Sequence, residues 1–219
     1  MLRDKVRATN ALSVNEIYET IQGEGLLAGT PSLFIRIQGC NLRCPWCDQP
    51  EALEFRKGIR VSLEEVLARA KESPFRHAVI TGGEPFTELN LGRLVKGLLE
   101  AGFSVQIETN GTFWNEDLEE VADRIHITCS PKGVADFFVH PKILKHTKEL
   151  KFVVDDAFTE EVILKEKFRR HLEEGLVVLQ PESNREEMIS KALSIQRSLS
   201  RKGFTVRVIP QIHKFLGIR

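Results

Sequence analysis

The sequence of 219 residues lacks a net charge, a long apolar run and any abundance of cysteine. Lys and Arg number 31, and so do Asp and Glu, so no overall field draws the chain toward nucleic acid or an anionic membrane. No run approaches the roughly 20 apolar residues that span a bilayer, and residues 1–10 lack the basic-then-apolar order of a signal peptide. These absences predict a cytoplasmic protein that acts on a small molecule.

The four cysteines are too few and too unevenly placed for a disulfide framework. Cys40, Cys44 and Cys47 fall within eight residues, while Cys129 lies far along the chain. A metal or redox site at the first three fits this spacing better than disulfide bonds do. Cys129, isolated in an apolar segment, is predicted to be a small core residue.

Short segments rich in Val, Ile and Phe alternate with longer stretches of helical spacing, and no repeat is present. This order predicts right-handed βα units in a single α/β domain over residues 1–219, with a mostly parallel sheet. The expected strands are 32–38, 77–81, 104–108, 125–128, 150–154 and 176–179. Six strands suit a partial, truncated (β/α)6-type barrel, whose chemistry would lie at the carboxyl ends of the strands.

Helices are expected between these strands. Ser62 can cap the first, with Glu65 three residues further on. The others are expected over residues 90–101, 115–122, 159–174 and 185–202, three of them ending near a glycine. Residues 204–209 form a last extended segment, and the C-terminal tail, residues 204–219, is expected to close the active site.

The cysteine-rich segment, residues 40–48, directly follows the first expected strand. Iron–sulfur clusters need thiolates close in sequence, because one short loop must wrap several corners of a cube. Three ligands for four irons leave one corner free, and catalytic metals keep such an open position. Structural zinc is the main alternative, although no nearby His completes a zinc set, and unligated thiols are another. The spacing favours a 4Fe-4S cluster among these three interpretations.

The spacing C-x₃-C-x₂-C, with the aromatic Trp46 before the last cysteine, resembles the radical S-adenosylmethionine superfamily. The second expected strand leads into Thr81-Gly-Gly-Glu-Pro85, which is similar to the glycine-rich motif of that superfamily. Glycines let the backbone approach the methionine end of the cofactor, and freed backbone groups can hold its amino group. The order of the two motifs, one βα unit apart, strengthens the resemblance.

Further motifs resemble one family of this superfamily, the 7-carboxy-7-deazaguanine synthases. They are residues 19–25 (ETIQGEG), Arg36, residues 107–112 (IETNGT), 130–132 (SPK), 179–181 (LQP) and 210–214 (PQIHK). The resemblance therefore spans nearly the whole chain.

The resemblance implies that a reduced 4Fe-4S cluster passes one electron to S-adenosylmethionine, giving methionine and a 5′-deoxyadenosyl radical. This radical would take hydrogen from C6 of 6-carboxy-5,6,7,8-tetrahydropterin. Ring contraction, hydrogen return and loss of ammonia would give 7-carboxy-7-deazaguanine for queuosine or other 7-deazapurines, with S-adenosylmethionine regenerated. The family further implies a homodimer and a flavodoxin- or ferredoxin-type reductant.

The resemblance also assigns residues to the two ligands. Those expected to bind S-adenosylmethionine are Trp46, Cys47, Asp48, Gly83, Glu84, Ser130, Pro131, Lys132 and Gln180. Those expected to bind the pterin are Ile21, Gln22, Gly23, Glu24, Arg36, Thr81, Glu108, Gln211 and His213. Arg36 is expected to hold the substrate carboxylate, because a planar guanidinium binds a carboxylate through two hydrogen bonds. Without the family resemblance, Arg36 would be interpreted as one member of an ion pair at the rim of the site, and His213 as a side chain exposed to solvent.

At one position the sequence departs from the family pattern. Gln49 follows Cys-Asp where the family has Thr or Ser, whose hydroxyl ligates Mg²⁺. A Gln carbonyl can ligate a hard cation, but its reach would move the ion, and Mg²⁺ demands near-ideal geometry. Either Gln49 holds a shifted Mg²⁺, with Asp48 or water supplying the missing oxygen, or the enzyme uses another ion or none, or the substrate differs.

Two other functions compete with the synthase. A glycyl-radical-enzyme activating enzyme shares the cysteine spacing, but its protein substrate leaves QGEG, Arg36 and His213 without an evident use. A scaffold that binds iron–sulfur or zinc without catalysis is the non-enzymatic alternative.

Overall fold

The computed structural model describes residues 10–218. Its strands are β1 (Ala11–Ile21), β2 (Pro31–Ile37), β3 (Ile59–Ser62), β4 (His77–Gly82), β5 (Ser104–Thr109), β6 (His126–Cys129), β7 (Glu149–Val154), β8 (Val177–Pro181) and β9 (Arg207–Val208). Its α-helices are α2 (Leu63–Glu72), α3 (Leu91–Glu100), α4 (Pro141–His146), α5 (Arg169–Glu173), α6 (Glu186–Arg201) and α7 (Ile212–Leu216). The expectation about a signal peptide concerns residues 1–10, of which all but the last lie outside the described residues.

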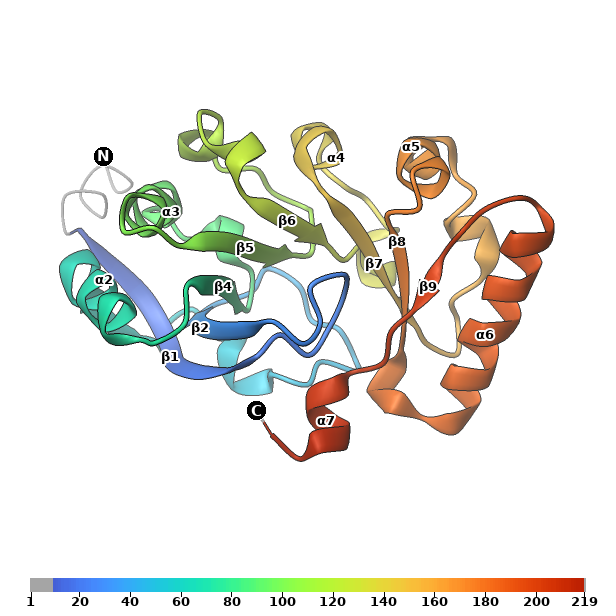
Figure 1. Cartoon of the computed structure of the whole chain (residues 1–219), viewed down its shortest axis with the longest axis horizontal. Helices are drawn as coiled ribbons and strands as arrows, with labels where there is room; N and C mark the ends of the chain where they lie inside the picture. Colours follow the sequence, from blue (N-terminus) through green and yellow to red (C-terminus); the bar gives the residue numbers. More distant parts are fainter. Residues whose placement is uncertain (1–9, 219) are drawn as a thin grey trace.

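The strands form one curved sheet in the order β3-β1-β2-β4-β5-β6-β7-β8-β9. Every neighbouring pair from β2 to β9 is parallel, whereas β1 pairs antiparallel with both β2 and β3. Figure 1 shows α2 to α6 around the outside of this sheet and α7 at its open side. The mostly parallel sheet with helices outside it confirms the expected truncated α/β barrel.

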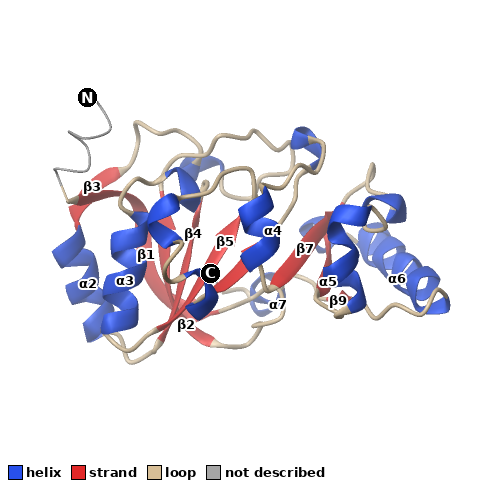
Figure 2. Cartoon of the chain, turned by 90° about the horizontal axis from the view of Figure 1, so that it is seen from above, coloured by secondary structure: helices blue, strands red, loops and turns tan. Residues whose placement is uncertain are grey.

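The apolar core lies between the sheet and its outer helices. Side chains alternate across a strand, so every second residue faces these helices. On β7 the outward residues Leu150, Phe152 and Val154 are fully buried. The ring of Phe152 packs 5.7 Å from that of Phe158 and 5.2 Å from that of Phe168. In Figure 2, α2 and α3 lie side by side at one end of the molecule and α6 lies at the other.

The predicted βα order is confirmed in most of its parts. All six expected strands are present within one or two residues of their predicted bounds. The Ser62 side chain accepts a hydrogen bond from the Glu65 backbone N–H at 3.1 Å and caps α2 as expected. The helices α3 and α6 match the predictions for 90–101 and 185–202, and β9 lies within the extended segment 204–209. Cys129 is fully buried in the core, as predicted.

The prediction of a helix over residues 115–122 is wrong. This segment contains one 3-10 turn at Glu116–Leu118, and a second turn begins at Ala122. The Asn115 side chain accepts from the Asp117 backbone N–H at 3.1 Å and donates to the Glu88 carbonyl at 3.0 Å, which fixes a turn. Helix nucleation is unfavourable in so short a segment, and burial of Leu118 can be satisfied by a turn instead.

The prediction of one helix over residues 159–174 is also wrong. The segment forms two 3-10 turns, Glu160–Val162 and Glu166–Phe168, before α5 begins. Ile163 and Phe168 are fully buried, and the irregular path carries both side chains into the core. Tertiary packing therefore overrides the helical spacing of the sequence.

Among the strands and α-helices of the described residues, four were not predicted: β1, β3, α4 and α7. β1 places Leu12 and Val14 in the core and then carries the chain into the QGEG segment. Its antiparallel partner β3 adds an edge to the sheet beyond the expected barrel. Among the described residues, no helix is long and apolar enough to cross a membrane.

Candidate active site

A cavity of about 630 Å³ lies on the inner side of the sheet, at the carboxyl ends of the strands. This volume is typical of sites that enclose a small molecule. The predicted site residues that line it are Ile21, Gln22, Gly23, Glu24, Arg36, Cys40, Cys44, Trp46, Cys47, Asp48, Gln49, Thr81, Gly83, Glu108, Ser130, Lys132, Gln180, Gln211 and His213. The fold thus brings residues from both predicted ligand groups to one cavity.

Glu84 and Pro131 do not line the cavity. The Glu84 carboxylate is fully buried and accepts hydrogen bonds at 2.7 Å from both the Thr109 hydroxyl and the Asn110 backbone N–H. Burial raises the pKa of Glu84, and these hydrogen bonds oppose that rise. Glu84 therefore fastens the glycine-rich loop to the end of β5, and its side chain lies behind the site.

The cysteine loop and the glycine-rich loop pack backbone against backbone. The Glu84 backbone N–H donates to the Gly39 carbonyl at 2.8 Å, and the Gly83 N–H donates to the Ile37 carbonyl at 3.0 Å. A Cβ on Gly83 would collide with the Gly39 carbonyl oxygen, so this approach requires glycine. The Asn110 amide donates to Asn41 Oδ1 at 3.0 Å and ties the end of β5 to the cysteine loop.

The three cysteines of the loop are suited to bind three different iron atoms of a cluster. Cys40, Cys44 and Cys47 are free thiols on the cavity wall. Within residues 10–218, no three His, Cys, Asp or Glu side chains converge to hold a single metal ion. A 4Fe-4S cluster instead takes each thiolate at a different iron. Burial raises the pKa values of the Cys40 and Cys44 thiols, so ligation there would release protons.

The wall beside the cysteine loop offers polar groups to a cofactor. The side-chain oxygen of Gln180, Oε1, is buried and has no hydrogen-bond partner within the described residues, and Gln180 lines the cavity. Such an acceptor requires a donor from a bound molecule or water. Lys132 lies 5.0 Å from the Trp46 ring centroid and donates to the Ser130 hydroxyl at 2.7 Å. Burial lowers the pKa of Lys132.

The opposite wall is built by the QGEG segment. Gln22 is almost fully buried, and its amide donates to Gln106 Oε1 at 2.9 Å and to Glu108 Oε1 at 3.1 Å. The Gln22 carbonyl oxygen accepts from the Glu24 backbone N–H at 3.0 Å. Both amide hydrogens of Gln22 are therefore used within the protein, and only its carbonyl oxygen has capacity left for a ligand.

Sequence reasoning missed Lys151, which lines the cavity from β7. Its ammonium pairs with Glu24 and lies 3.3 Å from Glu108 Oε1. Burial alone would raise the pKa of Glu24, but the Lys151 charge and hydrogen bonds from Lys151 and Gln211 lower it to about 2. Burial would lower the pKa of Lys151, but Glu108 and Glu24 together raise it. A lysine inside an otherwise apolar strand was the signal that could have revealed this residue.

The C-terminal tail docks on the mouth of the cavity. Gln211 Nε2 donates to Glu24 Oε1 at 2.7 Å and to Asp48 Oδ2 at 2.9 Å, so it joins the QGEG segment to the cysteine loop. The Ile212 backbone N–H donates to the Gly23 carbonyl at 2.9 Å. A Cβ on Gly23 would collide with the His213 ring, so the tail can dock in this way only on glycine.

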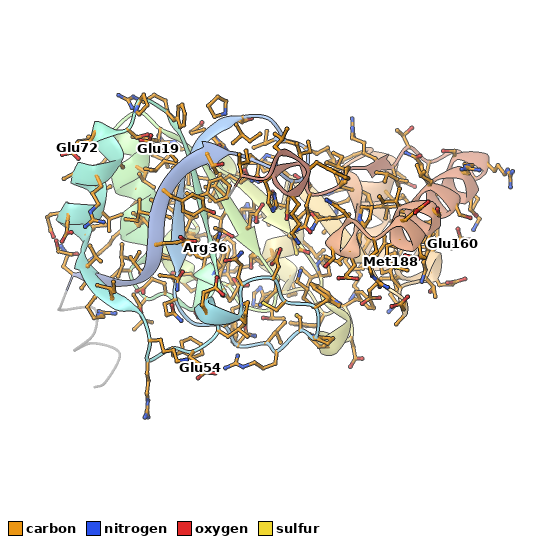
Figure 3. All side chains as sticks on the ribbon, turned by 90° about the horizontal axis from the view of Figure 1, so that it is seen from below. Glu19, Arg36, Glu54, Glu72, Glu160 and Met188 are labelled. Carbon is orange, nitrogen blue, oxygen red and sulfur yellow. The ribbon has the colours of Figure 1, made fainter. Side chains whose placement is uncertain are left out.

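Arg36 lies on β2 and lines the cavity, in the half of the molecule that holds β1 and α2 (Figure 3). Its Nε donates to Glu16 at 2.9 Å and its Nη2 to the Tyr18 hydroxyl at 2.7 Å. Both partners come from β1, one of the two strands that sequence reasoning missed. They fix the guanidinium plane on the cavity wall.

Gln49 lies at the mouth of the cavity, between Asp48 and a short 3-10 turn, Pro50–Ala52. Its backbone carbonyl accepts from the Ala52 backbone N–H at 3.1 Å, which begins the 3-10 turn.

Comparison of the sequence with known proteins agrees with this geometry. A model of the radical SAM superfamily matches residues 34–155. A 7-carboxy-7-deazaguanine synthase of Aquifex aeolicus (strain VF5) is 61% identical over 220 residues and covers the whole of both chains. Another, of Buchnera aphidicola, is 34% identical and covers 94% of this chain and 98% of its own.

Solved structures show the same similarity. The crystal structure of QueE from Escherichia coli superposes with a TM-score of 0.72 at 27% identity, covering 97% of this chain and 99% of that one. Streptococcus suis SuiB bound to S-adenosylmethionine has a TM-score of 0.55 at 15% identity, and covers 79% of this chain and 45% of its own. The second similarity shows the fold alone.

Proposed function

The chain belongs to the 7-carboxy-7-deazaguanine synthase family of the radical SAM superfamily, and we propose that its cavity converts 6-carboxy-5,6,7,8-tetrahydropterin to 7-carboxy-7-deazaguanine. The observation that carries the proposal is the meeting of three loops on one cavity. The cysteine loop and the glycine-rich loop form one wall, and the QGEG segment with the docked tail forms the other. One wall suits a radical-generating cofactor and the other a small polar heterocycle.

A radical SAM enzyme uses a 4Fe-4S cluster and S-adenosylmethionine, and the residues on the first wall fit both. Cys40, Cys44 and Cys47 would ligate the cluster. Gly83, Lys132 and Gln180 lie where they can hold S-adenosylmethionine, together with Trp46, Cys47, Asp48 and Ser130. When bound, these cofactors supply a radical that can remove hydrogen from the substrate. The protein binds and orients the reactants and excludes water from them.

The second wall would bind the pterin. Arg36 would hold the carboxylate, because Glu16 and Tyr18 already fix its guanidinium. Thr81 and Glu108 lie on neighbouring strands and would contact the ring, and Ile21, Gly23 and Glu24 would contact its amide-like edge. Gln211 and His213 would close the site from the tail.

The proposal includes Mg²⁺ held by Gln49. The support is limited to position: Gln49 and Asp48 both lie on the cavity wall and carry side-chain oxygen atoms, which this ion prefers. Removal of the ion with a chelator should then lower turnover and leave cluster iron unchanged.

The surroundings of the enzyme are proposed from the family. We expect each chain to form one core domain over residues 1–219, and two chains to form a homodimer in the cytoplasm. We expect a flavodoxin or ferredoxin to reduce the cluster. The alternative of a glycyl-radical-enzyme activating enzyme is not favoured, because relatives that match nearly the whole chain are named synthases.

The direct test is anaerobic turnover. Purified protein reconstituted with iron and sulfide is reduced with dithionite and given S-adenosylmethionine and 6-carboxy-5,6,7,8-tetrahydropterin. We expect 7-carboxy-7-deazaguanine by mass spectrometry, without net consumption of S-adenosylmethionine. Absence of product from protein that holds a complete cluster and cleaves S-adenosylmethionine would reject the proposed substrate but not the superfamily.

A further inference from the structure

Lys151 is a charged side chain inside a strand of the core sheet. Its sequence neighbours Leu150 and Phe152 are fully buried on the outer face, and its own side chain is only 5% exposed on the inner face. An unpaired ammonium is very unfavourable in such a place. Lys151 must therefore be held by specific partners.

Those partners are two carboxylates from distant parts of the chain. Glu24 belongs to the QGEG segment after β1, and Glu108 lies near the end of β5. The Lys151 ammonium pairs with Glu24 and lies 3.3 Å from Glu108 Oε1. Within residues 10–218, neither carboxylate forms an ion pair with any other cation. The Lys151 ammonium thus fixes the distance between two carboxylates that come from separate segments of the chain.

The remaining hydrogen bonds leave part of each carboxylate available. Glu24 Oε1 accepts from Gln211 at 2.7 Å, and Oε2 accepts from Lys151. Glu108 Oε1 accepts from Gln22 and Lys151, while the contact of Oε2 with the Thr81 hydroxyl is long, at 3.4 Å. Each carboxylate oxygen can accept two hydrogen bonds. Both residues line the cavity and retain capacity for donors from a ligand.

We propose that Lys151 is a positioning residue that holds the Glu24 and Glu108 carboxylates as a pair of hydrogen-bond acceptors for the N–H groups of the bound heterocycle. The substrate class is a ring with several adjacent N–H donors, such as the amide and amine edge of a reduced pterin. The inference rests on the proposed function for its substrate. Its structural part, two carboxylates held by one buried ammonium, stands on the geometry alone.

The electrostatics of the surroundings agree with this role. Burial favours protonated Glu24, and the Lys151 charge is the largest influence that opposes it, so the pKa of Glu24 falls to about 2. Gln211 and His213 from the tail lower it further. The other charged and titratable residues that line the cavity with the pair are Glu16, Tyr18, Arg36, Cys40, Cys44, Cys47, Asp48, Glu51, Lys132, Glu182, His213 and Lys214. Glu149 also acts on Lys151 from the same strand.

The test compares Lys151→Met, which keeps the length of the side chain, with Lys151→Arg, which keeps the charge. At neutral pH the Met variant should lose on the order of 100-fold in pterin turnover, the effect expected when an orienting group is misplaced. Without the ammonium, burial dominates and Glu24 binds a proton. The turnover of Lys151→Met should therefore rise as pH rises through a range where the wild type is flat. Lys151→Arg should restore turnover in part and abolish that pH dependence.

A readout independent of turnover is the infrared C=O band of a protonated carboxyl group. We expect this band at neutral pH in the difference spectrum between Lys151→Met and the wild type, and its loss from that spectrum when Glu24→Gln is added. The control is Lys202→Met, which removes an exposed ion pair with Glu160 at 2.7 Å and should change neither turnover nor the band. The double variant also removes the Glu24 charge and leaves only Glu108 without its cation, so it is expected to fold more stably than Lys151→Met if that variant unfolds.

Three outcomes would overturn the inference. They are equal turnover in Lys151→Met and wild type, a loss that is uniform at every pH, and absence of the protonated carboxyl band. If the wild type fails to turn over the pterin, the proposed function fails instead. The band then still decides whether Lys151 holds the carboxylate ionised.

Discussion

The two faces of the central sheet differ although they are made by the same strands. The outer face is apolar: β5 contributes Val105 and Ile107 to the core, and β7 contributes Leu150, Phe152 and Val154. The inner face of these strands is mainly polar: it carries Gln106 and Glu108 on β5, and Glu149 and Lys151 on β7 beside the apolar Val153. Both faces are largely buried, so exposure to solvent does not explain the difference.

The comparison separates stability from function. Buried polar groups require partners, and the inner face satisfies most of them with one another, as in the hydrogen bond of 2.9 Å from Gln106 to Thr128. The outer face has no such constraint and fills its space with hydrocarbon. Substitutions on the outer face should change the free energy of unfolding, whereas those on the inner face should change ligand binding and chemistry.

The largest effect is expected at the cysteine loop. Cys44→Ala should abolish S-adenosylmethionine cleavage with or without substrate, because it removes a proposed ligand of the cluster. Its control is Cys129→Ala on the outer face, which should retain iron and cleavage and lower the free energy of unfolding by about 1 kcal/mol. Iron analysis and anaerobic detection of 5′-deoxyadenosine measure both variants. Cleavage by Cys44→Ala would contradict the ligand assignment.

The outer face is tested by Phe152→Ala. The fully buried ring packs on Phe158 and Phe168, and its removal should lower the free energy of unfolding by about 3 to 5 kcal/mol. Urea denaturation measures the change, and Phe215→Ala, at a ring 63% exposed, should change it by less than about 0.5 kcal/mol. A loss of similar size in both variants would show that the outer face is not the stabilising one.

The inner face should contribute stability that depends on pH. The pKa of Glu24 is lowered from 4.5 to about 2, so its ionised form stabilises the protein above pH 4.5. This contribution, about 3 kcal/mol, should be lost as pH falls through that interval toward 2. Urea denaturation at several pH values should therefore show a weaker acid dependence in Glu24→Gln than in the wild type. Identical dependence would mean that the ion pair with Lys151 does not form in solution.

The smallest effect is expected at Arg36. Arg36→Ala should raise the apparent KM for the pterin about 10- to 100-fold, the value of charge-assisted hydrogen bonds, and change uncoupled S-adenosylmethionine cleavage less. The control Arg69→Ala removes an exposed ion pair with Glu65 on α2 and should be silent. Equal losses of turnover and cleavage in Arg36→Ala would show that this arginine does not act through the substrate.

Local signals were sufficient for much of the fold and for the cofactor wall of the site. Cys40, Cys44 and Cys47 lie in one loop, and Gly82 and Gly83 lie in another. Their roles could be predicted because each set is recognised from short spacing along the chain. The strands were found because their β-rich segments are short and bounded, and α2 because of its cap at Ser62. Segments 115–122 and 159–174 were mistaken for helices because their spacing is helical while long-range contacts of Phe158, Phe168 and Leu118 decide their path.

The sequence by itself determined the βα order, the cysteine loop, the glycine-rich loop and the family. Only the tertiary structure decided that Glu84 lies behind the site, that both amide hydrogens of Gln22 are used internally, and that Lys151 joins Glu24 to Glu108. The physical reason is distance along the chain. Spacing within a loop or a strand can be read from neighbouring residues, whereas the partner of a buried charge comes from another strand and is fixed only when the sheet closes around the cavity.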